Sequence, residues 1–231
     1  MFIPLGDNNA HRRTTPVIVP LLIAMNIVVW MVQLQRGEPF TNGFSFVPAE
    51  MTRGRDIVGT IRMVVQREPI SYSLYPSPKP LLFTAFSAMF MHGSWGHLLG
   101  NMVYLWIFGD QVEDRLGKIR FIFFYLLCGL VATAAHYASD PGSLIPSLGA
   151  SGAIAGVLGA YLVLYPTNRV TVLVFRWFLH LPAFLVLGGW FAMQVVGQFG
   201  APATGSSLVA YAAHLGGFMA GALGIVLFRV R

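Results

Sequence analysis

Six apolar segments separated by short polar connections dominate the chain of 231 residues. They cover residues 16–34, 81–108, 121–137, 150–165, 181–199 and 206–228. Most approach ~20 residues, the helix length needed to cross a bilayer core of about 30 Å. The pattern predicts an all-α polytopic membrane protein, a bundle of six transmembrane helices with a long outer loop (35–80) between helices 1 and 2.

The fourth apolar segment is short. As a helix it would span only ~24 Å at about 1.5 Å per residue, and it follows the Pro/Gly/Ser-rich stretch PGSLIPSLGA at 141–150. Its N-terminus is therefore expected within the membrane thickness. Irregular backbone is tolerated there where protein covers it or where it lines a water-filled cavity.

Two further stretches mix bulky apolar and charged residues, at 56–66 and 169–180. An apolar stripe beside charged positions is typical of a segment that lies in the membrane interface. We expect 169–180 to form an interfacial helix before Pro182, which would open the fifth span.

Composition and charge agree with a membrane protein. Only 10% of residues are charged and 55% are hydrophobic, against roughly 25% and 45–50% in soluble domains. The net charge of +6 does not indicate a nucleic-acid partner, because the basic residues form no aromatic-interleaved patch and lie mostly between apolar segments. The single cysteine, Cys128, excludes a disulfide framework.

The basic residues also predict the orientation. If six spans are present, nearly all Lys and Arg of the short connections fall on one side, which the positive-inside rule makes cytoplasmic. We therefore expect both termini in the cytoplasm, with residues 1–15 as a short cytoplasmic tail and 16–231 as a single membrane domain.

Strongly polar residues within the apolar segments are costly and indicate function. The second segment carries His92, His97 and Asn101, the fourth carries Ser151 and the sixth carries His214. Ser151 and His214 each lie fourteen residues before the cytoplasmic end of their segment. Each is then ~21 Å above that boundary, so the two side chains are predicted to meet at one level.

Glycines follow one face of the fourth and of the sixth segment at helical spacing. Such faces let two helices approach closely, and packing alone would explain them. The coincident depth of serine and histidine favours a chemical role as well. The residues are Gly149, Gly152, Gly156 and Gly159, and Gly217, Gly221 and Gly224.

A serine needs an adjacent base to act as a nucleophile, and His214 is the candidate. No Asp or Glu lies inside any of the six segments, and Asp140 in the outer loop is not expected to reach. The prediction is a Ser–His dyad. His97 and Asn101 are one helical turn apart and could stabilise an oxyanion together, provided that the second span tilts or runs past Gly109. His92 is ~140° around the helix and is assigned a structural role.

Three other site classes fit less well. The soluble G-x-S-x-G elbow needs a strand–turn–helix context, and position 153 is Ala. His92, His97 and His214 lack the spacing and carboxylates of a metal motif. A transporter would show corresponding broken helices in two halves, and no repeat is evident. The run GDQVEDRLGK at 109–118 is interpreted as a cytoplasmic turn fixed by Glu113 and Arg115.

Four motifs together resemble the rhomboid family of intramembrane serine proteases. They are HGSWGHLLGNM (92–102), FGDQVEDRLG (108–117), GASG (149–152) and AHLGGFMAG (213–221), and the resemblance covers about 81–224. It implies a nucleophile, Ser151, and a base, His214, with an oxyanion site from Asn101, His97 and the backbone around Ser151. His92, Gly149 and Gly152 would support that site.

The resemblance also implies six spans with an active site open to the outer side, gated by the fifth span and the following loop. Substrates would be single-span membrane proteins cut in or near the bilayer, and no cofactor is implied. A non-catalytic rhomboid-like protein that binds transmembrane clients is the alternative. The lack of a transit peptide favours a prokaryotic plasma membrane. Ala155 replaces an aromatic residue found in many relatives, and their Trp-Arg pair in the first loop is not found here.

Overall fold

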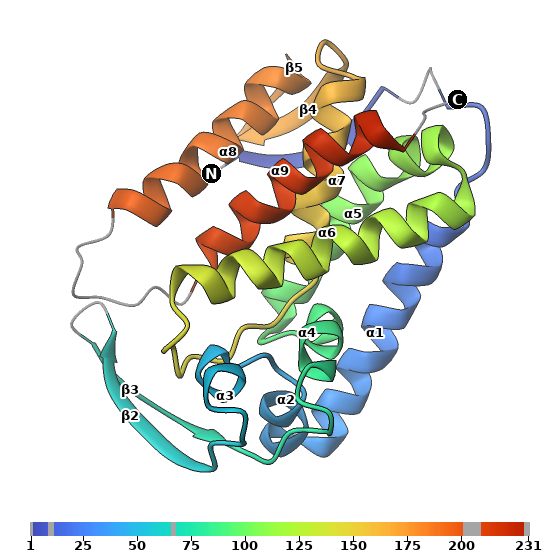
Figure 1. The fold of residues 1–231 in the computed structure, drawn as a ribbon. Helices are drawn as coiled ribbons and strands as arrows, with labels where there is room; N and C mark the ends of the chain where they lie inside the picture. The colour runs from blue at the N-terminus through green and yellow to red at the C-terminus, as the bar shows by residue number, and fades with distance from the viewer. Residues whose placement is uncertain (1, 9–11, 66–67, 201–208, 229–231) are drawn as a thin grey trace.

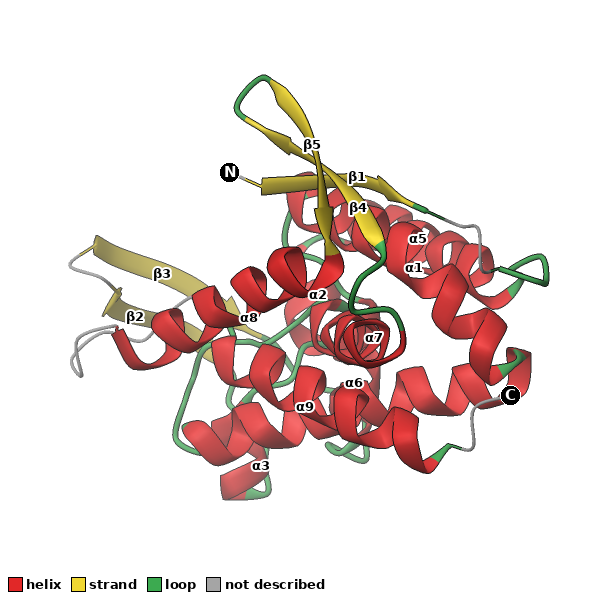
Figure 2. Ribbon diagram, turned by 90° about the horizontal axis from the view of Figure 1, so that it is seen from above, coloured by secondary structure: helices red, strands yellow, loops and turns green. Residues whose placement is uncertain are grey.

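The computed structural model describes residues 2–8, 12–65, 68–200 and 209–228 (Figure 1). Six long helices form the body of the molecule, and each overlaps one of the six apolar segments. Viewed from above, α7 runs end-on through the middle of the others (Figure 2). The helices are α1 (Ile18–Arg36), α5 (Trp95–Leu116), α6 (Lys118–Ser139), α7 (Ser151–Leu164), α8 (Ala183–Gly200) and α9 (Tyr211–Leu227).

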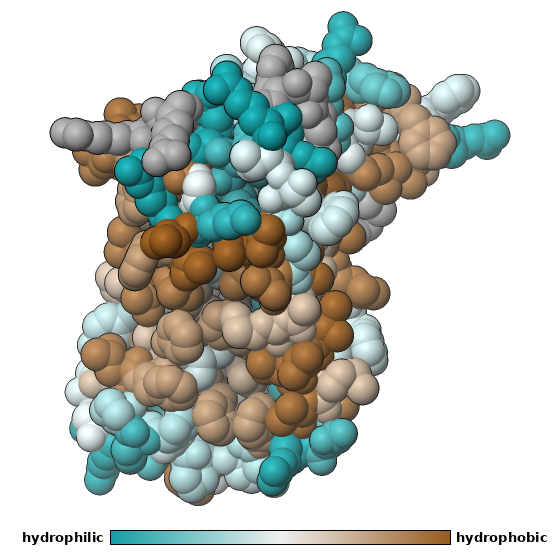
Figure 3. Space-filling view, turned by 90° about the vertical axis from the view of Figure 1, so that its right-hand side faces the viewer, coloured by the Kyte–Doolittle hydropathy of each residue, from teal (hydrophilic) through white to brown (hydrophobic). Residues whose placement is uncertain are grey.

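Within the described residues, α1, α6 and α8 are long and apolar enough to cross a membrane. Helices α7 and α9 are apolar but shorter, and α5 carries charged residues in its C-terminal half. On the face shown in Figure 3, hydrophobic side chains form a band across the middle of the molecule, with mostly hydrophilic side chains above and below it. The molecule is therefore an integral membrane protein.

The prediction of an all-α fold is wrong, although the chain is mostly helical. Five strands are present among the described residues, in an antiparallel sheet of order β1-β4-β5 and a hairpin of β2 and β3. Their bounds are β1 (Phe2–Asp7), β2 (Gly59–Val65), β3 (Glu68–Leu74), β4 (Arg169–Val174) and β5 (Trp177–Pro182).

Residues 169–180 therefore form a hairpin and not the expected interfacial helix. In β4, Val170 and Val172 are fully buried while their neighbours are more exposed. This alternation with period two, in β-branched residues, favours a strand over a helix. Phe175 adopts a positive φ of 55° at the turn, which reverses the chain. In the stretch 56–66, residues Gly59–Val65 form strand β2.

The N-terminal segment, expected as a short tail, is built into the fold. Strand β1 pairs with β4 along its length, and Arg12 forms an ion pair with Asp110 of α5 at 2.8 Å. The 35–80 region is likewise not an unstructured loop, because it contains α2 (Glu38–Gly43), α3 (Pro48–Arg53), β2 and β3. Residues 201–208, most of the loop expected to take part in gating, and the C-terminal residues 229–231 lie outside the described residues.

The second apolar segment is broken, and this break sets the position of the site. It begins with the short helix α4 (Phe83–Ser87) and the 3-10 turn η2 (Ala88–Phe90). Helix α5 then starts after Ser94, whose hydroxyl accepts the backbone N–H of His97 at 3.1 Å, a standard N-cap. The helix continues past Gly109 to Leu116, so the interpretation of 109–118 as a turn is wrong.

Glu113 explains why this charged run stays helical. Its buried carboxylate accepts hydrogen bonds from the backbone N–H groups of Val17, Ile18 and Val19 at 2.7–3.0 Å. These donors belong to the start of α1, where helical N–H groups lack intrahelical partners. Glu113 thus joins the end of α5 to the start of α1.

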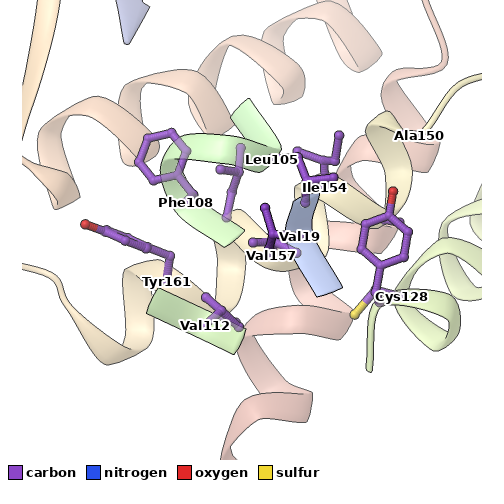
Figure 4. Packing of buried hydrophobic residues seen from close by; sticks show 14 of the residues in the cluster. Val19, Leu105, Phe108, Val112, Cys128, Ala150, Ile154, Val157 and Tyr161 are labelled. Atoms are coloured by element: carbon purple, nitrogen blue, oxygen red, sulfur yellow. The ribbon is translucent and has the colours of Figure 1, made fainter. Parts of the chain in front are cut away.

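The core lies where α1, α5, α6 and α7 meet (Figure 4). Val19 of α1 packs among Leu105 and Phe108 of α5 and side chains of α7. Phe108 meets Tyr161 edge to face, with ring centroids 5.0 Å apart. Each of these side chains is at most a few per cent exposed, so the elements that carry the site rest on a rigid support.

Close packing of α7 against α9 through glycines is confirmed. A Cβ on Gly159 would overlap the carbonyl oxygen of Phe218, and one on Gly217 would overlap that of Gly152. Only glycine permits backbones to approach this closely. This contact brings the N-terminal ends of the two helices together.

Candidate active site

Ser151 and His214 are in direct contact. Ser151 is the first residue of α7 and His214 lies in the first turn of α9. The serine Oγ and the imidazole Nε2 are 2.8 Å apart. Side chains separated by 63 positions in the sequence thus meet at one level, as the equal residue counts predict.

The backbone before Ser151 has a conformation that only glycine accommodates well. Gly149 has φ of +125°, and a Cβ there would lie 2.7 Å from the ring of His97. Its N–H donates to the carbonyl of Ala88 at 2.8 Å, which ties the loop to η2. The N–H of Ile154 donates to the carbonyl of Ala150. The N–H groups of Ser151 and Gly152 lie earlier in the first turn, where helical partners are lacking.

His97 and Asn101 lie beside this turn, on the face of α5 toward α7. The Nδ2 atom of Asn101 is 3.7 Å from the position that a Cβ on Gly149 would take. Both residues line the same cavity as Ser151 and His214. The condition on depth is met because α5 runs past Gly109. Gly152 packs against α6, where its Cβ would lie 2.6 Å from that of Ala132.

His92 holds Asn101 and does not reach the serine. Asn101 Nδ2 lies 2.9 Å from His92 Nε2, and because an amide nitrogen only donates, the imidazole nitrogen accepts. The backbone of His92 is itself fixed by Gln33 of α1, through bonds of 3.0 and 2.9 Å. His92 is fully buried, so it orients the amide of Asn101 from behind.

A cavity of about 950 Å³ is lined by four polar side chains of the candidate site, those of Ser151, His214, His97 and Asn101. Its lining extends to Asn42 and Tyr72 in the 35–80 region and to Asp140 in the loop after α6. The cavity thus leads from the dyad to the end of the molecule that carries these loops. Asp140 lines it, but no hydrogen bond joins Asp140 to His214 among the described residues.

Gln194 is a contact of the site that the sequence analysis missed. Its Oε1 lies 2.8 Å from His214 Nδ1, the position that an Asp occupies in a catalytic triad. Trp190, one turn earlier on α8, has its ring centroid 5.8 Å from that of His214. The signal for Gln194 in the sequence is a polar side chain within the fifth apolar segment. Because it is not ionisable, it does not stand out as a partner for His214.

The arrangement suits acyl transfer. A hydroxyl in contact with an imidazole, beside amide and backbone donors, contains the parts of a serine hydrolase site. Within the described part of the chain, no group of three His, Cys, Asp or Glu residues is placed to hold a metal ion.

Comparison with known proteins gives a consistent result. A family model described as a Rhomboid domain matches residues 80–231. The chain is 33% identical over 165 residues to the mitochondrial presenilin-associated rhomboid-like protein of Bos taurus, covering 68% of this chain and 41% of that protein. It is 34% identical over 143 residues to the mitochondrial rhomboid protein 1 of Saccharomyces cerevisiae, covering 58% and 38%.

A shorter match, 40% identical over 79 residues, relates the chain to rhomboid protease GluP of Bacillus subtilis, covering 34% of this chain and 15% of that protein. The chain spans about two fifths of the length of the Bos taurus relative. The family model nevertheless matches well over half of the chain and includes every candidate site residue. The chain belongs to the rhomboid family.

Proposed function

We propose that the chain is an intramembrane serine endopeptidase that hydrolyses peptide bonds in or near transmembrane segments of single-span membrane proteins. The observation that carries this proposal is the 2.8 Å contact between Ser151 Oγ and His214 Nε2 on the wall of a large cavity. The Bacillus subtilis relative is named a rhomboid protease, which supports the same activity.

In this mechanism Ser151 Oγ attacks the carbonyl carbon of the scissile bond while His214 Nε2 takes the serine proton. The negative charge that develops on the carbonyl oxygen is stabilised by Asn101, His97 and the N–H groups at the start of α7. Collapse breaks the C–N bond, and His214 returns the proton to the amine leaving group. Water then attacks the acyl-enzyme while His214 takes one of its protons. The bond to Ser151 Oγ breaks, and His214 returns the proton to the serine.

The cavity supplies a route for that water and for an extended substrate segment. We propose six membrane spans, formed by α1 and α5–α9, with the cavity open to the outer side. Helix α7 begins at Ser151 and has 14 residues, so it is too short to cross a full bilayer core. Its N-terminus and the dyad would lie below the outer membrane surface.

The membrane is proposed to be a prokaryotic plasma membrane, with both termini cytoplasmic. Two relatives named above are called mitochondrial, and one comes from Bacillus subtilis. A mitochondrial membrane is therefore the alternative location, and fractionation of cells that express the chain distinguishes the two.

The test of activity is cleavage of a reporter transmembrane substrate in vesicles by the wild type, Ser151→Ala and His214→Ala. We expect both variants to lose cleavage and Ser151→Ala to lose labelling by a fluorophosphonate. Cleavage at the wild-type rate by both variants would rule out the dyad. No cleavage by the wild type would instead support the alternative, a non-catalytic rhomboid-like protein that binds transmembrane clients.

A further inference from the structure

We propose that Gln194 is a positioning residue for His214, whose amide oxygen accepts the Nδ1 proton and thereby keeps Nε2 free for the proton of Ser151. This inference rests on the proposed function and adds to it a third residue, carried by α8.

The geometry defines which end of the Gln194 amide faces the imidazole. Its Oε1 lies 2.8 Å from His214 Nδ1, and its Nε2 donates to the carbonyl oxygen of Trp190 at 3.3 Å. Because that carbonyl can only accept, the amide nitrogen points toward it and the amide oxygen points toward His214. Gln194 is only 8% exposed, so water does not compete freely for either bond.

An amide oxygen carries no proton, so the nitrogen that it faces must supply one. A neutral imidazole has a single N–H, and this contact places it on Nδ1. The other nitrogen, Nε2, then has a free lone pair directed at Ser151 Oγ, as a general base requires. When Nε2 takes the serine proton, the same amide oxygen stabilises the imidazolium.

Among the described residues no hydrogen bond joins a carboxylate to His214, although Asp140 lines the same cavity. His97 and His136 are the other titratable groups close enough to interact with it electrostatically. A neutral acceptor orients the imidazole without the desolvation cost of a buried charge. This accounts for a dyad that works without an aspartate inside the bundle.

Trp190 and Ala155 fit the same arrangement. Ala155 is fully buried on α7 and offers no ring to His214, whereas the ring of Trp190 lies 5.8 Å from the imidazole at an angle of 40°. Trp190 and Gln194 are one helical turn apart, so α8 supplies both contacts. A displacement of α8 away from α9 would leave His214 with neither.

The experiment compares the wild type, Gln194→Met and Gln194→Glu in vesicles with the reporter substrate. Methionine keeps the length of the side chain and removes the acceptor, and glutamate keeps an acceptor. We expect Gln194→Met to lower kcat about 10-fold, in line with the loss of one hydrogen bond to a group that becomes charged, with KM unchanged. Gln194→Glu should recover much of that loss. Gln35→Met, the same change at an exposed position of α1, should match the wild type.

A second measurement is independent of turnover. In protein labelled with 15N-histidine, the His214 resonances, identified by their absence from His214→Ala, should report a protonated Nδ1 in the wild type and a mixture of tautomers in Gln194→Met. Wild-type kcat together with an unchanged tautomer in Gln194→Met would overturn the proposal. If Gln194→Met does not fold, a folded Gln194→Glu as inactive as His214→Ala would overturn it instead.

The two proposals fail in different ways. Cleavage by Ser151→Ala at the wild-type rate removes the proposed function itself. Loss of cleavage in Ser151→Ala, combined with full activity and an unchanged His214 tautomer in Gln194→Met, removes only the role of Gln194.

Discussion

Gly221 of α9 lies so close to Gly156 of α7 that a methyl group on Gly221 would overlap the carbonyl oxygen of Gly156. The two helices carry the dyad at their N-terminal ends, and this contact lies about two turns further along α9 from His214. The distance between Ser151 and His214 therefore depends on glycines outside the cavity.

Gly221→Ala should lower the free energy of unfolding by about 1–3 kcal/mol, the usual cost of overpacking a rigid core. Thermal unfolding in detergent micelles measures it. Gly188→Ala is the matched control, since no atom lies within 4 Å of its added Cβ. There we expect no loss, and a gain of up to ~1 kcal/mol from helix propensity. Equal midpoints for both variants would contradict the packing argument.

Gly149→Ala should impair both folding and cleavage. The φ of +125° is unfavourable for alanine, and the added Cβ would press on the ring of His97 at 2.7 Å. Backbone strain of this kind costs about 1–3 kcal/mol, and relief by moving His97 would disturb the proposed oxyanion site. Rates of fluorophosphonate labelling and cleavage measure the effect. Gly142→Ala, where the nearest atom is 3.7 Å away, should behave as the wild type.

Asn101→Ala should lower kcat by about 100-fold or more with little change in KM, as expected for a donor used mainly in the transition state. His92→Ala should give a smaller loss, because the amide of Asn101 would remain but lose its partner at 2.9 Å. Steady-state cleavage kinetics distinguish the two variants. A larger loss for His92→Ala than for Asn101→Ala would reverse the assignment of their roles.

Glu113→Gln should destabilise the protein by about 2 kcal/mol. The carboxylate accepts three backbone N–H groups at the start of α1, and hydrogen bonds to charged groups contribute about 1.5–3 kcal/mol. A glutamine side chain has one oxygen and one NH2 group. It would therefore either point its NH2 group at these backbone N–H groups or lose one of the hydrogen bonds. Glu38→Gln, at an exposed position of α2, should change stability by less than about 0.5 kcal/mol. Thermal unfolding of the two variants provides the comparison.

Asp7 gives the fold a pH dependence. Burial, together with the charge of Asp110, raises the pKa of its carboxyl to about 6, although Tyr161 and Gln111 donate hydrogen bonds to it. The folded state then binds this proton more tightly than the unfolded state, whose pKa is near the ordinary 3.8. The protonated Asp7 therefore stabilises the fold fully below its ordinary pKa of 3.8, and this stabilisation is lost as the pH rises through about 6.

Asp7→Asn removes this titration, so its unfolding midpoint should change less than that of the wild type between about pH 4 and 6. The variant should also be the more stable protein at pH 7. Both Tyr161 and Gln111 donate to the same oxygen of Asp7, and the amide oxygen of asparagine can take its place. Parallel pH profiles for the two proteins would show that Asp7 does not titrate in this range.

The approximate positions of the long helices were predictable, because each of the six overlaps a long apolar run in the sequence. The meeting of Ser151 with His214 was predictable from equal counts to the ends of two helices whose glycines force them together. The strands were not predictable. The stretch 169–180 is short, and the alternation that begins with Val170 and Val172 gives way to consecutive apolar residues.

Long-range hydrogen bonds explain the other differences between the sequence predictions and the structure, at residues 109–118 and at Gln194. Residues 109–118 look like a polar turn until Glu113 is seen to bind the start of α1, almost one hundred positions earlier. Gln194 is one of two glutamines in the fifth apolar segment, 181–199. Only the packing of α8 against α9 distinguishes it from the other, Gln198. Hydropathy along the chain contains neither relationship.

The pairing of β1 with β4 has a consequence for biogenesis. Five of the six residues of β1 pair with residues of β4 that lie more than 160 positions later in the chain. During synthesis the first strand therefore remains without this partner while the chain through α7 is made, and the sheet closes as a late event. Chains that stall before residue 169 would expose this strand at the membrane surface, where quality-control proteases and chaperones could recognise unfinished molecules.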